Sequence, residues 1–298
     1  MGFTDQIRRA AARVAGRARS VRVVAEAIEP YAVTLASRSP PPPDLEGATL
    51  EERAAFSLTL NAINFGSGWF PTLRKKEGRS GYRTVEAGLR AHGPWSADAL
   101  AAMTAEEIAV VTGQDPAHEL MHHYARHLRE LGERVRDAHE GSFLALARSG
   151  EGSAERMASR LGSWPTWRDV SVYDGADVPF FKRAQIAAAD LAVAGIAPVD
   201  DLGTLTLFAD NLVPHVLRID GVLEFDPDLV ARIDAEQLIE HDSPEEVEIR
   251  ACALHAVELL VAAHGDTTAT AVDNVLWNRG AAPRYKARPR HRARTTDY

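Results

Sequence analysis

The stretch SPEEVEIRACALHAVELLVAAHG, residues 243–265, contains the start, the body and the end of one long helix. Ser243 is a natural N-cap residue, Pro244 occupies the first helical position, and Glu246 stands where a capping box requires an acidic side chain. Gly265 supplies the C-terminal stop. Because the segment is apolar over most of its circumference, we expect this helix to lie at the centre of the core of a helical fold.

Helical patterns also dominate outside this stretch. Residues 48–65 repeat apolar side chains at a spacing of three to four, and residues 116–147 predict two successive amphipathic helices that separate near Glu140-Gly141. Residues 1–28 predict one or two amphipathic surface helices, since they lack the continuous apolar stretch of a secretory signal. The sequence therefore predicts a mainly α protein.

Strand signals are confined to two short segments. Residues 168–173 and 178–181 flank Asp174-Gly175, a dipeptide typical of tight hairpin turns. We expect one short β-hairpin at most.

A polyproline stretch, Ser39–Asp44, is the clearest linker and must be extended. We accordingly divide the chain at this point. Residues 1–44 are expected to form N-terminal helices and a linker that pack on the body, and residues 45–298 a single helical catalytic domain.

The composition limits the classes of partner. The chain has 298 residues, 45% of them hydrophobic, which is ordinary for a globular protein with a sizeable core. A net charge of −8 argues against a protein that binds long nucleic acids, but it permits a single nucleotide as ligand. No apolar run approaches the roughly 20 residues of a membrane span. The single cysteine, Cys252, cannot form an internal disulfide, so we expect a cytoplasmic protein.

The last fifteen residues form a basic tail. Residues 284–298 contain six lysines and arginines and one acidic residue, Asp297. Such a tail on an acidic protein is either a solvated end or a strand folded back over an anionic site, and we favour the solvated end.

Residues 118–127, HELMHHYARH, contain the H-E-x-x-H pattern of zinc metalloproteases in His118, Glu119 and His122. The metzincin extension of that pattern would place a glycine and a third histidine at positions that Ala125 and Leu128 occupy here. We therefore expect no metal at this site, and a zinc-dependent hydrolase remains a rival interpretation.

A second candidate site centres on Asp210, within LTLFADNLVPHVLR (205–218). Asp210 precedes a predicted helix whose fourth residue is Pro214, so it is well placed as an N-cap. Such a cap stabilises a helix by about 1 kcal/mol. The same geometry favours the ionised carboxylate, which can stabilise or capture an oxocarbenium ion at a sugar C1′.

Three further residues suggest a nucleotide site. Lys182 opens a predicted helix and can neutralise a phosphate or position Asp210; the alternative is an exposed helix start. Asp273 and Trp277 lie one turn apart on one helix face, where the carboxylate can bind a guanine-like edge and the indole can stack on the base. Taken alone, these two favour a core tryptophan beside an aspartate at a helix start.

Several short motifs together resemble the queuosine salvage proteins, a family of queuosine 5′-phosphate N-glycosylases, from about Leu58 to Tyr298. The motifs are Asn61-Ala62-Ile63-Asn64-Phe65, Ser80-Gly81-Tyr82, Arg168-Asp169-Val170, Phe181-Lys182-Arg183-Ala184-Gln185, Phe208-Ala209-Asp210, Glu246-Val247-Glu248-Ile249-Arg250, Leu276-Trp277 and His291-Arg292-Ala293-Arg294. Their order and spacing are specific, although each motif alone is weak.

The resemblance implies a helical fold similar to helix-hairpin-helix DNA glycosylases, with Asp210 matching the catalytic aspartate. It implies hydrolysis of queuosine 5′-phosphate to queuine and ribose 5-phosphate, with no metal. We expect a monomer that binds this small nucleotide and needs no cofactor. The substrate-binding residues that we assign on this basis are Asn64, Phe65, Lys182, Phe208, Asn211, Asp273, Trp277 and Tyr298.

The chain also departs from the family pattern near the expected site. Asn211 and Leu212 stand where a Tyr-Arg pair usually follows the aspartate, and residues 66–68 after Phe65 are glycine-rich. These differences leave open which 7-deazapurine base is recognised and whether the substrate is a nucleoside or a 5′-phosphate. A non-catalytic nucleotide-binding homologue is the second rival interpretation.

Overall fold

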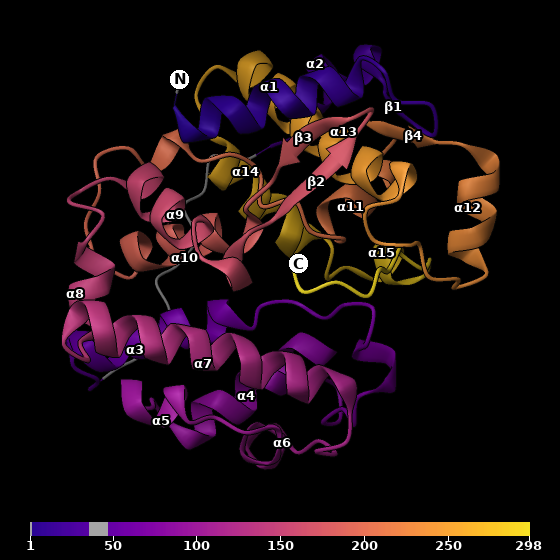
Figure 1. Cartoon of the computed structure of the whole chain (residues 1–298). Coiled ribbons are helices and arrows are strands. Elements are labelled where there is room, and N and C mark those ends of the chain that lie inside the picture. The colour runs from indigo at the N-terminus through magenta and orange to yellow at the C-terminus, as the bar shows by residue number, and fades with distance from the viewer. Residues whose placement is uncertain (1, 36–46) are drawn as a thin grey trace.

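The computed structural model describes residues 2–35 and 47–298, and helices make up most of it (Figure 1). The α-helices are α1 Phe3–Ala15, α2 Ala25–Ala32, α3 Leu50–Ala62, α4 Gly81–His92, α5 Ala97–Ala101, α6 Ala105–Thr112, α7 Glu119–His139, α8 Phe143–Arg148, α9 Ala154–Gly162, α10 Lys182–Val193, α11 Val213–Ile219, α12 Pro227–Asp234, α13 Pro244–His264, α14 Ala269–Arg279 and α15 Pro283–Lys286. Short 3₁₀ turns are η1 Phe70–Thr72, η2 Pro165–Trp167 and η3 Leu202–Thr204, and the strands are β1 Val21–Val23, β2 Val170–Tyr173, β3 Ala176–Pro179 and β4 Leu223–Phe225. The prediction of a mainly α protein is confirmed.

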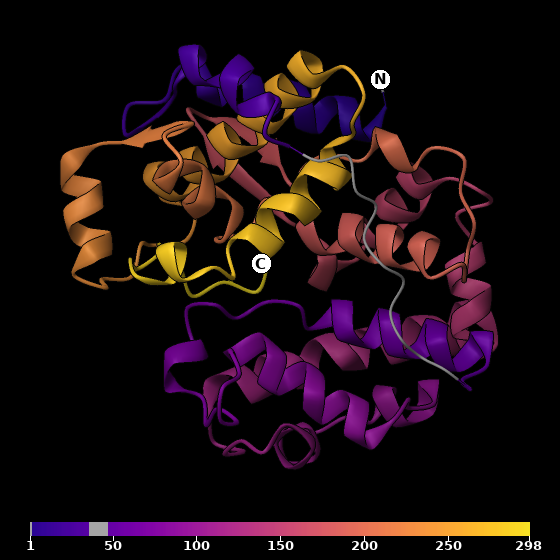
Figure 2. The same cartoon turned by 180° about the vertical axis from the view of Figure 1, so that it is seen from behind.

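The buried apolar side chains form two clusters. One cluster joins α3 to α10, and the other joins α1 and α2 to the segment from α11 to α15. In Figure 1, α3 to α7 form the lower half of the molecule, and α1, α2 and α11 to α14 lie in the upper half. The molecule therefore has two helical halves, with the segment that follows α15 passing between them (Figure 2).

Helix α13 lies at the centre of the upper half, as the sequence predicts. It packs against α1, α2, α14 and β1, and most of its side chains from Glu246 to Leu260 are buried. Its ends also match the prediction, because the Ser243 side chain accepts a hydrogen bond from the Glu246 amide and Gly265 adopts the left-handed conformation.

The predicted reciprocal half of the α13 capping box is wrong. The Glu246 carboxylate accepts the amide of Asp242 at 3.2 Å rather than the amide of Ser243. Glu246 is fully buried beside two cationic side chains, His241 at 3.6 Å and Arg250 at 3.9 Å. These charges turn the carboxylate away from the position that a capping box requires.

The other predicted helices have the expected boundaries within a few residues. The segment 48–65 contains α3, and the segment 116–147 contains α7 and α8. These two helices separate at Glu140 and Gly141, which both have positive φ values, 53° and 77°. The break is confirmed, since a left-handed residue ends a helix.

The predicted hairpin is confirmed as β2 and β3, which pair antiparallel across Asp174 and Gly175. The expectation of one hairpin at most is wrong, because β1 also pairs antiparallel with β4, with Val21 opposite Phe225. Each of these strands has three residues and its partner is about 200 positions away, so no local sequence signal marks them.

The N-terminal helices are amphipathic, as predicted. Helix α1 buries Ile7, Ala10, Ala11 and Val14 against the upper half, and its packing partner is α13. The polyproline stretch Ser39–Asp44 and the predicted boundary at residue 44 lie outside the described residues, so the division into two parts stays a prediction. Among the described helices, none combines the length and the apolar character needed to cross a lipid bilayer.

Candidate active site

A pocket of about 800 Å³ lies where the two halves meet. Its walls come from the loop after α3, the start of α4, the start of α10, the segment before α11, one face of α14 and the tail after α15. All nine side chains that the sequence analysis assigned to a site line this pocket: Asn64, Phe65, Lys182, Phe208, Asp210, Asn211, Asp273, Trp277 and Tyr298. A smaller hollow of about 280 Å³, lined mainly by aliphatic side chains, lies elsewhere, so the chemically reactive groups gather in the larger pocket.

Asp210 is fixed by the backbone of the segment that follows it. Its Oδ1 accepts the amides of Leu212 at 2.8 Å and Val213 at 3.1 Å. The prediction that Asp210 is the N-cap is wrong, because the N-cap of α11 is Leu212. Asp210 lies two residues earlier and binds the amides of the N-cap and of the first helical residue. The helix begins later than predicted, so Pro214 is its second residue rather than its fourth. Both bonds use Oδ1, which leaves Oδ2 as the oxygen that can face a ligand.

Lys182 is buried at the start of α10, so the alternative of an exposed helix start is wrong. Its amide donates to Asp169 Oδ2 at 2.9 Å, and its Nζ donates to the carbonyl of Asn64 at 2.9 Å. Burial lowers the pKa of Lys182 to about 8, against the opposing effect of the Asp210 carboxylate. The ammonium and the Asp210 carboxylate thus share one pocket at neutral pH.

Asp273 and Trp277 both line the pocket from α14, so the interpretation as a core tryptophan beside a helix-start aspartate is wrong. Trp277 is partly exposed, and the guanidinium of Arg83 lies 5.3 Å from its ring. Burial, together with the nearby Asp210 charge, raises the pKa of Asp273 well above its usual range. A protonated Asp273 can donate a hydrogen bond as well as accept one.

Phe65 forms part of the floor of the pocket. It is buried, its ring meets that of Tyr124 edge-on at 5.2 Å, and the buried Arg183 guanidinium lies 5.1 Å from the ring. Next to it, Asn64 donates from Nδ2 to Asn61 Oδ1 at 3.2 Å. Contacts with neighbouring side chains therefore fix the positions of both residues.

The basic tail lies along the pocket, so the favoured interpretation as a solvated end is wrong for residues 288–298. The Asn211 side chain donates to the carbonyl of His291 at 3.1 Å, and the amide of Gly66 donates to the carbonyl of Tyr298 at 3.2 Å. Burial lowers the pKa of Arg290, and the Asp210 carboxylate opposes this shift. The tail thus brings its cations to the pocket that contains Asp210.

Several pocket residues were absent from the sequence-based assignment. They are Lys75, Arg79, Tyr82, Arg83, His215, Lys286, Arg288, Arg290 and Arg292. Tyr82 and Arg292 belong to the motifs that carry the family resemblance, so that resemblance was a usable signal for them. His215 follows Pro214 in α11 and donates from Nε2 to the Tyr285 carbonyl at 2.8 Å, a contact that no local pattern marks.

The H-E-x-x-H motif lies at the start of α7, outside this pocket. His118 is the N-cap: Nδ1 accepts the Leu120 amide at 3.2 Å, and Nε2 lies 2.8 Å from the hydroxyl of Thr72. Glu119 accepts the indole N–H of Trp69 at 2.7 Å, and His122 is exposed. In a zincin both histidines project from one helix toward one ion, whereas here His118 uses both ring nitrogens within the protein.

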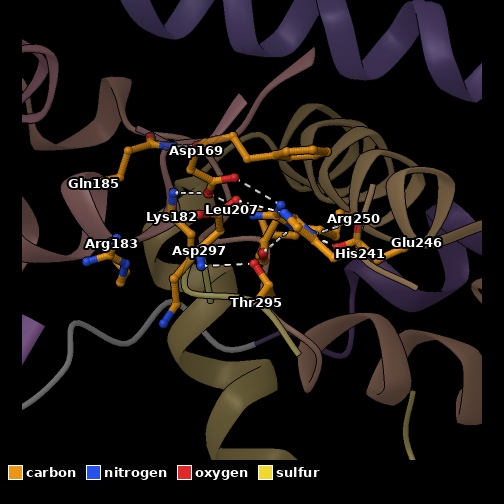
Figure 3. Close-up of polar contacts among 12 residues, drawn as sticks. Asp169, Lys182, Arg183, Gln185, Leu207, His241, Glu246, Arg250, Thr295 and Asp297 are labelled. Atoms are coloured by element: carbon orange, nitrogen blue, oxygen red, sulfur yellow. Dashed lines mark hydrogen bonds and ion pairs between the residues drawn. The ribbon is translucent and has the colours of Figure 1, made fainter. Parts of the chain in front are cut away.

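Within residues 2–35 and 47–298, one group of side chains is close enough to hold a metal ion, namely His241, Asp242 and Glu246. His241 Nε2 lies 3.2 Å from Asp297, while Nδ1 lies 3.6 Å from Glu246, so its two nitrogens face different carboxylates (Figure 3). Burial acts to lower the pKa of His241, but the bonds to Asp297 and Glu246 outweigh it and raise the pKa to about 10. This arrangement fits a protonated imidazole that ties the tail to α13.

A family model described as "Queuosine salvage protein" matches residues 45–298. The chain belongs to the queuosine salvage protein family. The resemblance inferred from the motifs is thereby confirmed.

Relatives of this queuosine salvage protein occur in bacteria and eukaryotes. A protein of Sphaerobacter thermophilus named "Queuosine 5'-phosphate N-glycosylase/hydrolase" is 34% identical over 96% of this chain and 95% of its own length. A protein of Dictyostelium discoideum with the same name is 33% identical over 68% of this chain and 66% of its own length. Another, from Schizosaccharomyces pombe, is 32% identical over 53% of this chain and 48% of its own length.

Proposed function

We propose that this queuosine salvage protein hydrolyses the N-glycosidic bond of queuosine 5′-phosphate, or of a close 7-deazapurine nucleotide, and releases queuine. The names of its relatives support this activity. The observation that carries the proposal is the Asp210 carboxylate, which two amides orient within a pocket of about 800 Å³. A volume of about 300–1,000 Å³ is usual for a site that binds a small molecule.

The base would bind between aromatic side chains. Phe65, Phe208 and Trp277 line one continuous pocket and can stack on the faces of a deazapurine. Asp273 lies in the same pocket and can meet the hydrogen-bonding edge of the base. Burial and the Asp210 charge raise the pKa of Asp273, which favours its neutral form beside a departing anionic ring.

Asp210 would act on the ribose. Position 7 of queuine is carbon, so that position cannot take up a proton to help the base depart. The rate acceleration must therefore come from stabilisation of the charges that develop on the base and the ribose in the transition state. As the C1′–N9 bond breaks, its electron pair moves onto the base and positive charge develops at C1′. The Asp210 carboxylate stabilises that cation, or captures it in a C1′–O bond. A water oxygen then forms the new bond to C1′, and any bond to Asp210 breaks with its electron pair returning to the carboxylate. One proton from this water ends on the base and the other hydrogen remains on the ribose hydroxyl.

The phosphate would bind to cations at the pocket. Lys182 is buried within the pocket, and Arg290 brings charge from the tail close to Asp210. Lys75, Arg79 and Arg83 line another part of the wall. An enclosure with this many cations favours a dianionic phosphate over a neutral nucleoside.

We propose three further properties. The helical body would have the arrangement of helix-hairpin-helix DNA glycosylases, which the mainly helical content and the aspartate at a helix start support. The protein would act as a monomer, since one chain supplies every wall of the pocket. It would work in the cytoplasm, in keeping with a single, buried and unpaired cysteine, Cys252.

The test is incubation of the purified protein with queuosine 5′-phosphate, with the released base followed by chromatography and mass spectrometry. Asp210→Asn keeps the shape of the side chain and removes its charge, so kcat should fall by at least about 100-fold. Two further substrates are tested in parallel. The queuosine nucleoside shows whether the phosphate is required, and guanosine 5′-phosphate shows whether the deazapurine base is required. Thermal stabilisation by the nucleotide without any turnover would instead favour the non-catalytic homologue.

A further inference from the structure

Asp169 and Arg250 form a fully buried ion pair behind the pocket (Figure 3). Arg250 projects from α13, and Asp169 directly precedes β2. Arg250 Nη1 donates to Asp169 Oδ1 at 3.0 Å and Nη2 donates to Oδ2 at 2.8 Å. Two parallel bonds of this kind fix the angle between the groups as well as their distance.

Each member of the pair also holds a segment of the candidate active site. Arg250 Nε donates to the carbonyl of Ala209 at 3.1 Å, which fixes the peptide that leads into Asp210. Asp169 Oδ2 accepts the amide of Lys182 at 2.9 Å. One ion pair therefore connects the segments that carry the pocket's carboxylate and its ammonium.

Two aromatic rings pack against the Arg250 guanidinium. Its Cζ lies 4.0 Å from the ring centroid of Phe180 and 4.4 Å from that of Tyr298. Phe180 belongs to the segment that leads into α10, and Tyr298 lies at the end of the tail and lines the pocket. The guanidinium thus contacts the segment before α10, the tail and, through Ala209, the segment that leads into Asp210.

A purely stabilising role explains this arrangement poorly. Moving two charges out of water costs so much that a buried ion pair often contributes little net stability, and apolar replacements of similar volume can be neutral. What an apolar pair cannot reproduce is the set of directed bonds to Ala209 and Asp169. These bonds set where Asp210 and Lys182 lie relative to each other.

We propose that Arg250 is a positioning residue for the glycosidic cleavage, acting through the Ala209 carbonyl on Asp210 and through Asp169 on Lys182. This inference rests on the proposed function. Because the carboxylate acts when charge develops at C1′, a misplaced Asp210 weakens the transition state more than the bound substrate. Loss of Arg250 should therefore lower kcat by a larger factor than it raises KM.

The experiment compares Arg250→Lys and the double variant Asp169→Asn/Arg250→Met with a matched control, Glu248→Gln. Glu248 is buried on the same helix, but it accepts the amides of Arg19, Ser20 and Val21, far from Asp210 in the chain. The double variant removes both buried charges, and the asparagine side chain that replaces Asp169 keeps an oxygen that can accept the Lys182 amide. The fold should therefore survive even where a single variant is unstable.

We expect kcat for queuosine 5′-phosphate to fall about 100-fold in Arg250→Lys and in the double variant, with KM within about threefold of wild type. Glu248→Gln should lose thermal stability and keep its kcat. A double variant whose melting temperature and kcat both return to wild-type values would overturn the proposal, because the pair would then serve stability alone. Wild-type kcat in Arg250→Lys would also overturn it.

A second readout separates this inference from the proposed function. Amide hydrogen exchange of Leu212 and Val213, which bond to Asp210, reports on the geometry without any turnover. Both amides should exchange faster in Arg250→Lys and keep their protection in Glu248→Gln. If wild type fails to cleave the nucleotide but this pattern is seen, the substrate assignment fails and the positioning role stands; unchanged exchange in Arg250→Lys refutes the positioning role.

Discussion

A β-carbon placed on Gly68 would lie 2.3 Å from the carbonyl oxygen of Ala293. The loop after Phe65 and the tail are therefore in direct backbone contact, and the neighbouring Gly66 amide bonds the Tyr298 carbonyl. This contact explains the glycine at position 68. The loop belongs to the lower half and the tail is tied to the upper half by the bond from the Ile239 amide to Arg292, so the tail connects the two halves.

Gly68→Ala should displace the tail from the pocket. The added methyl group meets backbone atoms of Ala293 and Arg294, which cannot rotate away as a flexible side chain can. We expect a loss of about 1–3 kcal/mol in the free energy of unfolding and a higher KM, measured by denaturant titration and steady-state kinetics. Gly16→Ala is the control, since its β-carbon finds only ordinary contacts, at 3.5 Å and beyond. Equal behaviour of the two variants would contradict the role of the contact.

Lys182 should give the reaction an alkaline limb. Its pKa is lowered to about 8 by burial, so kcat/KM should fall as the pH rises through about 8 and the ammonium loses its proton. In Lys182→Met the activity should be low and this limb absent. The stability of the wild type should rise relative to this variant between about pH 8 and pH 10.5, because only the unfolded chain still binds the proton there. A limb of unchanged position in Lys182→Met would assign it to another group.

Asp273→Asn should stabilise the protein increasingly as the pH rises. The pKa of Asp273 is raised in the folded protein by burial and by the Asp210 charge, so wild-type stability falls as the pH rises from the unfolded value of about 4 toward the raised folded value. Asparagine has no such dependence. Calorimetry from pH 4 to pH 8 should show a growing gap in melting temperature between variant and wild type. Asp228→Asn, on the exposed surface of α12, serves as the control, and a gap that narrows with pH would refute the raised pKa.

Trp277→Ala should weaken substrate binding. Loss of one base–aromatic stack costs about 1–3 kcal/mol, so KM should rise about 5- to 150-fold. Trp95→Ala removes another partly exposed indole, which lies outside the pocket, and should leave KM unchanged. An unchanged KM in Trp277→Ala would show that the base lies elsewhere.

Removal of metal should leave the activity intact. His118 caps α7 through Nδ1, so His118→Ala should cost about 1 kcal/mol of stability without changing turnover. His122→Ala, at an exposed position, should change neither quantity. Turnover that is lost in EDTA and restored by Zn²⁺ would favour the zinc hydrolase instead.

The sequence by itself determined the local structure. Ser243 and Gly265 mark the two ends of α13, and Glu140-Gly141 separates α7 from α8. Asp174-Gly175 forms the turn of the hairpin. Each of these signals acts between residues that are close in the chain. The ordered motifs were also sufficient to indicate the family and the residues of one pocket.

Only the tertiary structure decided the environment of those residues. Lys182 is buried rather than exposed, Glu246 faces His241 rather than its own helix cap, and the basic tail lines the pocket rather than entering solvent. The second sheet, β1 with β4, was equally invisible in the sequence. Burial and charge pairing depend on segments tens to hundreds of residues apart, and a pattern read along one segment carries no information about which distant segment will cover it.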